Sequence, residues 1–225
     1  NRQFAQAAAT LEPVIDQGTG ASDPGLLALA GEAYMRSKQY AKATQYFERA
    51  LALDPRNAST RVSLGRSRIA TGDTDRAIAD LEAAAKLDPG GSQADITLAM
   101  LNLGRKEFDQ ALRTISKLES TQPENTLLHN LKGVAYLGKR DTAKARAQFE
   151  LALKIDPAYF PAAANLASLD LRAGNKDAAR RRYESVLEKD KNQESAMLAL
   201  AELATKTQRP EKEVLGWIDR AKAAA

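Results

Sequence analysis

The chain has 225 residues, with 33 Lys and Arg against 29 Asp and Glu, which gives a formal net charge of +4. A surplus this small, with few aromatic residues among the basic ones, does not favour nucleic acid as a partner. There is no cysteine, so disulfides, thiolate metal sites and a cysteine nucleophile are excluded. The longest uncharged run, at 158–169, is shorter than the roughly 20 residues of a membrane span.

The first element expected in chain order is a helix over residues 1–17. Its apolar residues Phe4, Leu11 and Val14 have the spacing of Phe108, Ile115 and Leu118 further along the chain. We therefore expect this helix to be half of a repeated unit, namely its second helix, followed by a loop at 18–23.

Four prolines then recur every 34 residues, at Pro55, Pro89, Pro123 and Pro157. A fixed period of this length predicts an array in which one supersecondary unit is stacked repeatedly. With the proline at position 32 of each unit, residues 24–225 divide into six units that start at residues 24, 58, 92, 126, 160 and 194.

Small or apolar residues recur at the same positions of the units, most regularly at positions 8, 20, 24 and 27. In the first unit, positions 4, 7, 8, 11, 20, 24 and 27 hold Leu27, Ala30, Gly31, Tyr34, Ala43, Phe47 and Ala50. This pattern resembles the tetratricopeptide repeat, a helix–turn–helix unit. The resemblance predicts an all-α fold, a right-handed α–α superhelical solenoid of about six and a half repeats and 13 helices.

Local signals agree with these helices. Proline at position 32 cannot continue a helix, Asn57 and Asn125 are suitable N-caps, and Gly72 and Gly174 stand where first helices are expected to end. Three departures are visible. Lys132 stands at position 7 of the fourth unit, Lys191 replaces the proline of the fifth unit, and the sixth unit stays in register only if its turn near Pro210 is one residue longer.

Few residues suggest chemistry. His129 is the only histidine, and it stands at position 4, where a packing residue is expected. Arg180, Arg181 and Arg182 form the one basic run, which we expect to be a solvated helix face; the alternative is a patch for anions or lipid headgroups. The sequence therefore predicts neither an enzyme nor a metal or cofactor site.

The first helices of the units are expected to line a concave groove that binds protein or peptide partners. The residues of the middle units expected to point into it are Val62, Arg66, Ile69, Ile96, Met100, Leu103, Asn130, Val134, Leu137, Ala164, Ser168 and Leu171. The alternative is that the neighbouring unit partly buries positions 12 and 13. Neither the Lys and Asn clamp of chaperone-binding repeats nor an asparagine ladder at position 6 is present.

Residues 122–204 also contain features that the repeat does not require. These are the pair His129 and Asn130, the segment YFPAAANLASLD at 159–170, and LALAELA at 198–204. They resemble the PEP-CTERM-system tetratricopeptide lipoprotein family. The resemblance implies an interaction scaffold of the bacterial envelope, periplasmic or anchored to the outer membrane, in exopolysaccharide export or exosortase-linked sorting.

The organisation of the whole protein is also an expectation. The chain begins with Asn1 and no signal peptide is visible, so we expect a piece of a longer protein, with a lipid anchor possible upstream. The open ends of the array would allow self-association. The alternative function is a regulatory or targeting region of a larger enzyme.

Overall fold

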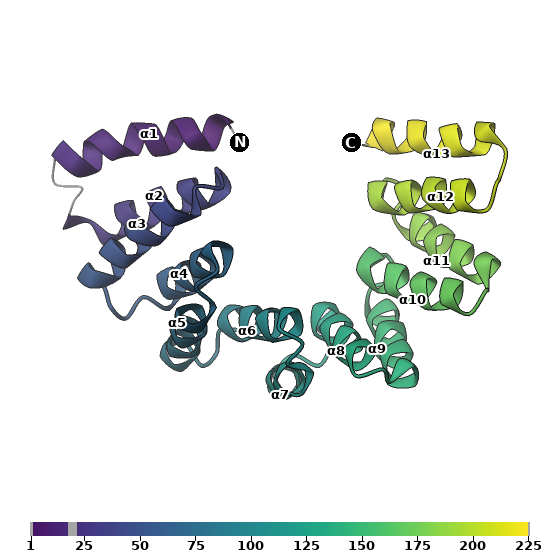
Figure 1. Ribbon diagram of the computed structural model, residues 1–225, viewed down its shortest axis with the longest axis horizontal. Helices are drawn as coiled ribbons and strands as arrows, with labels where there is room; N and C mark the ends of the chain where they lie inside the picture. The colour runs from purple at the N-terminus through teal and green to yellow at the C-terminus, as the bar shows by residue number, and fades with distance from the viewer. Residues whose placement is uncertain (1, 18–21, 225) are drawn as a thin grey trace. The chain divides into compact units, whose positions relative to one another are not determined.

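The computed structural model describes residues 2–17 and 22–224, which form helices and no strands (Figure 1). They divide into two compact units, Asn1–Leu101 and Asn102–Ala225, which are described separately. The helices are α1 (Arg2–Gln17), α2 (Pro24–Arg36), α3 (Tyr40–Leu53), α4 (Ala58–Thr71), α5 (Thr74–Leu87), α6 (Gln93–Gly104), α7 (Phe108–Glu119), α8 (Thr126–Gly138), α9 (Thr142–Ile155), α10 (Phe160–Arg172), α11 (Lys176–Lys189), α12 (Glu194–Lys206) and α13 (Glu211–Ala224).

The expected all-α fold of 13 helices is confirmed over these described residues. Five first helices begin at the residue where the 34-residue register starts a unit, and α6 begins one residue later, at Gln93. Of the loop expected at 18–23, only Ser22 and Asp23 lie within the described residues. The Asn57 and Asn125 side chains accept hydrogen bonds from Thr60 N and Leu127 N, so both predicted N-caps are present.

First helices pack on the second helix of their repeat, as α2 does on α3, α4 on α5, α8 on α9, α10 on α11 and α12 on α13. Position 8 allows this close approach. A Cβ atom added at Gly31 would lie 2.5 Å from Cε1 of Phe47, and Gly133 faces Phe149 in the same way. Phe47 and Phe149 are fully buried, so aromatic rings fill the space that the glycines leave.

The turn between the two helices of a repeat has one backbone conformation throughout. Its residue at position 15 has a positive φ in all six repeats, where the chain has Lys38, Gly72, Lys106, Arg140, Gly174 and Gln208. The next residue donates its N–H to the carbonyl five residues earlier, for example Asp73 to Arg68 and Asn175 to Asp170. This bond satisfies a carbonyl that the end of a helix would otherwise leave free.

The turn between repeats does not depend on its proline. At the site where Lys191 replaces proline, Gln193 N still donates to the Asp190 carbonyl at 3.2 Å. The Asp190 carboxylate also accepts from Asn192 N at 3.0 Å. Asp156 makes the same kind of contact with Ala158 N, so the aspartate before the proline supports this turn.

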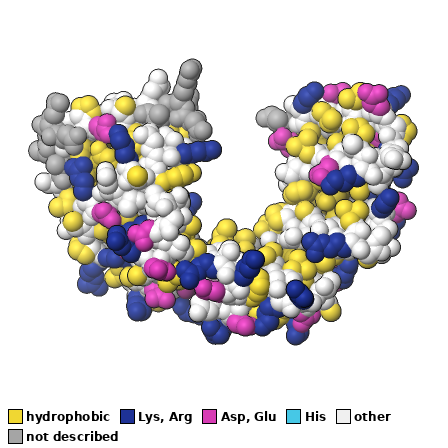
Figure 2. Space-filling model, in the orientation of Figure 1, with side chains coloured by type: hydrophobic (Ala, Val, Ile, Leu, Met, Phe, Trp, Pro, Cys, Tyr) yellow, Lys and Arg dark blue, Asp and Glu magenta, His cyan; other side chains and the backbone are white. Residues whose placement is uncertain are grey.

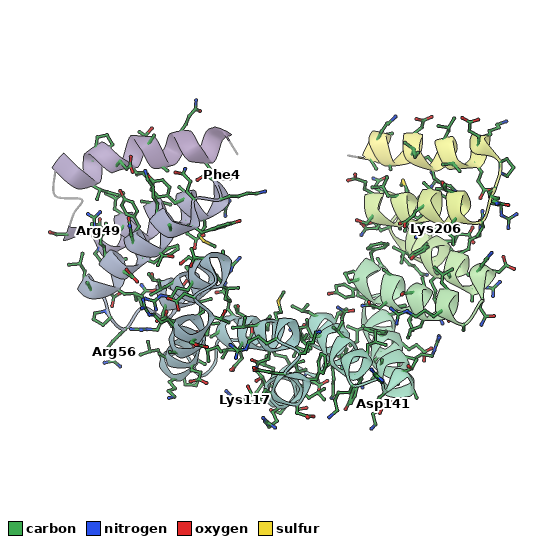
Figure 3. All side chains as sticks on the ribbon, in the orientation of Figure 1. Phe4, Arg49, Arg56, Lys117, Asp141 and Lys206 are labelled. Atoms are coloured by element: carbon green, nitrogen blue, oxygen red, sulfur yellow. The ribbon has the colours of Figure 1, made fainter. Side chains whose placement is uncertain are left out.

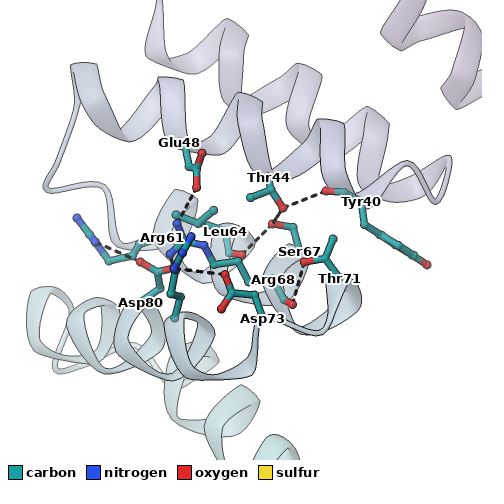
Figure 4. Close-up of polar contacts among 11 residues, drawn as sticks. Tyr40, Thr44, Glu48, Arg61, Leu64, Ser67, Arg68, Thr71, Asp73 and Asp80 are labelled. Atoms are coloured by element: carbon teal, nitrogen blue, oxygen red, sulfur yellow. Dashed lines mark hydrogen bonds and ion pairs between the residues drawn. The ribbon is translucent and has the colours of Figure 1, made fainter.

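Charged clusters occupy the repeat interior where other units have tyrosine at position 11. In the first compact unit, Arg68 donates to Asp80 in its own repeat and to Glu48 of the preceding repeat, the latter at 2.7 Å (Figure 4). In the second compact unit, Asp170 accepts from Arg146 at 2.8 Å and from Arg182 at 3.2 Å.

The two buried carboxylates have opposite pKa shifts. Burial raises the pKa of Asp80, and the charge and hydrogen bond of Arg68 only partly offset this. Burial also acts to raise the pKa of Asp170, but the hydrogen bonds from Arg146 and Arg182 outweigh it and hold that pKa below its ordinary value. Asp170 is therefore the better-compensated charge.

Candidate partner-binding surface

The residues predicted to line the groove fall into a packed group and an exposed group. In the first compact unit, Val62 is buried in a core cluster with Leu81 and Leu98, and Ile69 packs against that cluster. Arg66 and Met100 are exposed, and the Met100 side chain is 54% accessible. Ile96 is half-buried.

In the second compact unit, the predicted groove residues are all buried or half-buried. Val134 and Leu137 pack against the cluster around Phe149, while Ala164 and Leu171 pack against a cluster that contains Leu200. Leu103 and Ser168 are half-buried. Asn130 is buried, and its Oδ1 accepts a hydrogen bond from Asn165 at 3.0 Å.

Helix geometry explains only part of this division. Positions 5 and 12 are seven residues apart, so they lie on one stripe of the helix. Val62 and Ile69 hold these positions in one repeat, and both pack against a core cluster. Position 9 borders that stripe, and its residue is exposed at Arg66 and Met100 but packs against a core cluster at Val134. We call the surface formed by positions 2, 6, 9 and 13 the first-helix face.

The first compact unit has a pocket of about 850 Å³ on this face. It lies between α1, α2 and the start of α4, and its lining residues are Phe4, Thr10, Leu11, Leu29, Glu32, Ala33, Arg36 and Ser59. Leu29 is 56% accessible. The Arg36 guanidinium lies 5.1 Å from the centre of the Phe4 ring, which projects from α1 (Figure 3). The volume is within the usual range for ligand pockets.

This pocket was not expected, because only residues of the middle repeats were predicted to line the groove. The same positions in the first repeat would have found Glu32 at position 9 and Arg36 at position 13, but not Leu29 at position 6. The contribution of α1 could not be found in that way, because it depends on how the half repeat packs against α2.

His129 takes part in local hydrogen bonding. Its Nε2 lies 2.9 Å from the Pro123 carbonyl, which can only accept, so Nε2 carries the proton. Its Nδ1 lies 3.0 Å from the Gln148 side chain. Arg61, also at position 4, donates to the carbonyl of Pro55 at 3.0 Å. The residue at position 4 in these two repeats thus holds the preceding inter-repeat turn.

Charges are mixed over the surface. On the face shown in Figure 2, Lys and Arg side chains lie among Asp and Glu side chains in each compact unit. Within residues 2–17 and 22–224, no group of three or more His, Asp or Glu side chains is placed to hold a metal ion. None of the described helices is both long and apolar enough to span a bilayer.

Comparison with protein families identifies the repeat. Tetratricopeptide repeat models match residues 30–102, residues 136–203, and, in a third case, residues 1–58 together with 96–160. The third match alone covers more than half of the chain. The chain belongs to the tetratricopeptide repeat family. Proteins of this family generally mediate protein–protein interactions.

Individual relatives are more distant. The chain is 29% identical over 119 residues to a DnaJ homolog subfamily C member 7 homolog of Dictyostelium discoideum. That match covers 51% of this chain and 22% of the relative. The chain is also 22% identical over 188 residues to the anaphase-promoting complex subunit CDC16 of Saccharomyces cerevisiae, a match that covers 80% of this chain and 22% of that relative. The chain therefore spans about a fifth of the curated relatives it matches.

Solved structures share the fold at low sequence identity. The anaphase-promoting complex hetero-tetramer Cut9–Hcn1 superposes with a TM-score of 0.68 at 19% identity, covering 100% of this chain and 43% of that one. PilW, a widely conserved type IV pilus biogenesis factor, gives a TM-score of 0.66 at 19% identity, covering 89% and 92% of the two chains. These likenesses show a common fold.

Proposed function

We propose that this protein is a non-catalytic scaffold that binds segments of partner proteins on its first-helix face. The observation that carries the proposal is the pocket between α1 and α2, where Phe4, Leu11 and Leu29 give an apolar lining. Exposed apolar side chains gathered in one concave place mark interaction sites more often than scattered ones do.

The lining defines the kind of segment that fits. Apolar side chains form the interior of the pocket, while Glu32 and Arg36 add one charge of each sign. The Glu32 carboxylate accepts a hydrogen bond from Ser63 at 2.5 Å, which leaves Arg36 as the more available charge. An amphipathic segment that places apolar side chains against Phe4 and Leu29 matches this pattern.

The biological setting is part of the proposal. We infer a role in the bacterial envelope, in exopolysaccharide export or PEP-CTERM exosortase-linked sorting, with the protein periplasmic or held at the outer membrane. The support is the resemblance of residues 122–204 to that lipoprotein family. Fractionation of the cells that make the protein tests this, and recovery in the soluble cytoplasmic fraction would contradict it.

The binding role is tested with charge substitutions on the exposed face. We expect Leu29→Glu and Met100→Glu each to reduce capture of crosslinked partners at least about tenfold, because a charge placed in an apolar contact must be desolvated. Leu53→Glu on α3 is the matched control, since Leu53 is 47% accessible and lies outside the first-helix face. Equal loss in the control, or unchanged capture by both face variants, would contradict the proposal.

The alternative is that these repeats direct or regulate a catalytic domain elsewhere in a larger protein. The observation that favours it is the length of the curated relatives, of which the chain covers about a fifth. The sequence of the parent protein separates the two proposals, because a downstream transferase or kinase domain supports the alternative.

A further inference from the structure

A second pocket, of about 900 Å³, lies in the second compact unit away from the first-helix face. It is lined by residues 174–178, which include the end of the turn after α10 and the first residues of α11, and by residues 207–210 in the turn between α12 and α13. Both turns lie at the same edge of this unit (Figure 1). Leu200, Leu203 and Ala204 of α12 complete the lining, together with Arg180 and Arg181 of α11.

The arginine run on α11 divides at this pocket. Arg180 pairs with Glu184 at 2.7 Å and with Glu213 at 2.6 Å, and Arg182 pairs with Asp170 at 3.2 Å on the other side of the helix. Arg181 is exposed and lines the pocket. Arg180 and Arg182 are therefore held in ion pairs within the protein. Arg181, between them, makes no ion pair with any of the described residues.

Two further free cations line the same pocket. Lys176 and Arg209 are exposed, and among the described residues neither side chain takes part in an ion pair or hydrogen bond. Asp177 is the one carboxylate in the lining. Asn175 makes no side-chain cap bond to α11, so the amides of the first helical turn also favour negative charge at this edge.

We propose that this pocket binds an acidic segment of a partner protein, with Arg181 and Arg209 each taking a carboxylate and Lys176 adding a third positive charge. Arginine matches a carboxylate with two parallel N–H···O bonds, which gives direction as well as attraction. The apolar side chains of Leu200 and Leu203 can contact aliphatic stems between the acidic groups. The site does not depend on the first-helix face.

The pocket favours a peptide over a single small anion. Its volume of about 900 Å³ is far larger than one phosphate group needs. The cations also come from two segments separated in sequence, residues 176–181 at the start of α11 and residue 209 in the turn before α13. Carboxylates spaced along an extended segment can contact the cations of both segments, whereas a single phosphate would contact the cations of only one.

The test is fluorescence anisotropy of a labelled Glu-rich peptide of about 12 residues, titrated with the whole chain at physiological salt. We expect saturable binding that weakens at least about tenfold in the double variant Arg181→Glu/Arg209→Glu, and that weakens further as salt is raised. Both residues are exposed, so helicity measured by circular dichroism should be unchanged. Lys154→Glu, an exposed lysine on α9, makes the same kind of charge change outside the pocket and is expected to keep the affinity.

Three results would overturn the proposal. The first is no saturable binding of the peptide, and the second is equal loss of affinity in Lys154→Glu. The third is that inorganic phosphate or alginate, a polymer of uronic acids, binds in a way that depends on Arg181 and Arg209 while the peptide does not. Leu29 and Met100 do not line this pocket. A negative result for acidic-peptide binding can therefore be distinguished from a negative result for partner binding on the first-helix face.

Discussion

Arg68 donates a hydrogen bond to Asp80 between the two helices of the second repeat, and three repeats later the same two positions are held by Asp170 and Arg182 with the charges exchanged. Both repeats therefore have an ion pair at positions 11 and 23, but the positive and negative residues have exchanged positions. A chain that paired the helices of these two repeats wrongly would bring like charges together. The arrangement thus favours pairing within each repeat.

The first prediction concerns the coupling of Arg68 and Asp80. Removing either partner leaves a nearly buried charge, since the two side chains are 14% and 9% exposed. That charge keeps one remaining ion-pair partner, Arg61 for Asp80 and Glu48 for Arg68. We expect Arg68→Met and Asp80→Asn each to lower the free energy of unfolding by about 3 kcal/mol. The double variant should lose less than the sum by at least about 1 kcal/mol. Urea unfolding of the four proteins measures this, and additive losses would show that the pair is not coupled.

The second prediction uses the opposite pKa shifts of Asp170 and Asp80. The pKa of Asp170 is lowered by folding, so its ionised form stabilises the protein above the ordinary value of about 3.9, and this stability is lost as the pH falls through the folded pKa. The pKa of Asp80 is raised, so its contribution falls as the pH rises from about 3.9 through the raised value.

The measurement is urea unfolding of wild type, Asp170→Asn and Asp80→Asn between about pH 3 and about pH 6. The stability gap between wild type and Asp170→Asn should widen as the pH rises, and the gap for Asp80→Asn should narrow. Slopes of the same sign for both variants would contradict the assignment.

The third prediction concerns the left-handed turn inside each repeat. Gly72 and Gly174 have φ values of 86° and 80°, and an added Cβ would meet no atom within 4 Å at either site. The cost of Gly72→Ala or Gly174→Ala is therefore a backbone cost, about 1–2 kcal/mol. Gly216 in α13 is also open but helical, so Gly216→Ala should instead stabilise by up to about 1 kcal/mol. Thermal unfolding of the three variants measures this. Equal destabilisation of all three would show that the left-handed backbone conformation is not the cause of the loss.

The fourth prediction concerns the close contact of Gly133 with Phe149. We expect Gly133→Ala to destabilise by about 1–3 kcal/mol, because the new methyl group overlaps the ring. Adding Phe149→Ile should recover part of this loss, since the third repeat holds Ala99 and Ile115 at the same two positions, both fully buried. If Phe149→Ile made the alanine variant less stable still, the two positions would not be complementary in the way proposed.

Much of the fold could be predicted because the repeat is short-range in sequence. The prolines set a period, and the small residues at position 8 predicted the close helix pairs in which Gly31 and Gly133 now face rings. The left-handed residue at position 15 could be predicted only at Gly72 and Gly174. At Lys38, Lys106, Arg140 and Gln208 the same φ is imposed by the packing of the two helices, and no local preference signals it.

The binding surface was less predictable. Helical position alone did not separate Met100, which is exposed, from Val134, which holds the same position 9 and packs against a core cluster. Packing of the adjacent repeats decides the difference. Likewise, the run of Arg180, Arg181 and Arg182 gave no sign that ion pairs to Glu213 and Asp170 would occupy two members and leave Arg181 at a pocket.

Partner binding on the first-helix face can be tested by site-specific photo-crosslinking in the cells that produce the protein, with a benzophenone amino acid placed at residue 29, 100 or 53. All three native side chains are exposed, so the probe should be tolerated at each site. We expect discrete crosslinked partners from residues 29 and 100 and none from residue 53. Crosslinks from residue 53 alone, or none from residues 29 and 100, would show that partners do not bind this face.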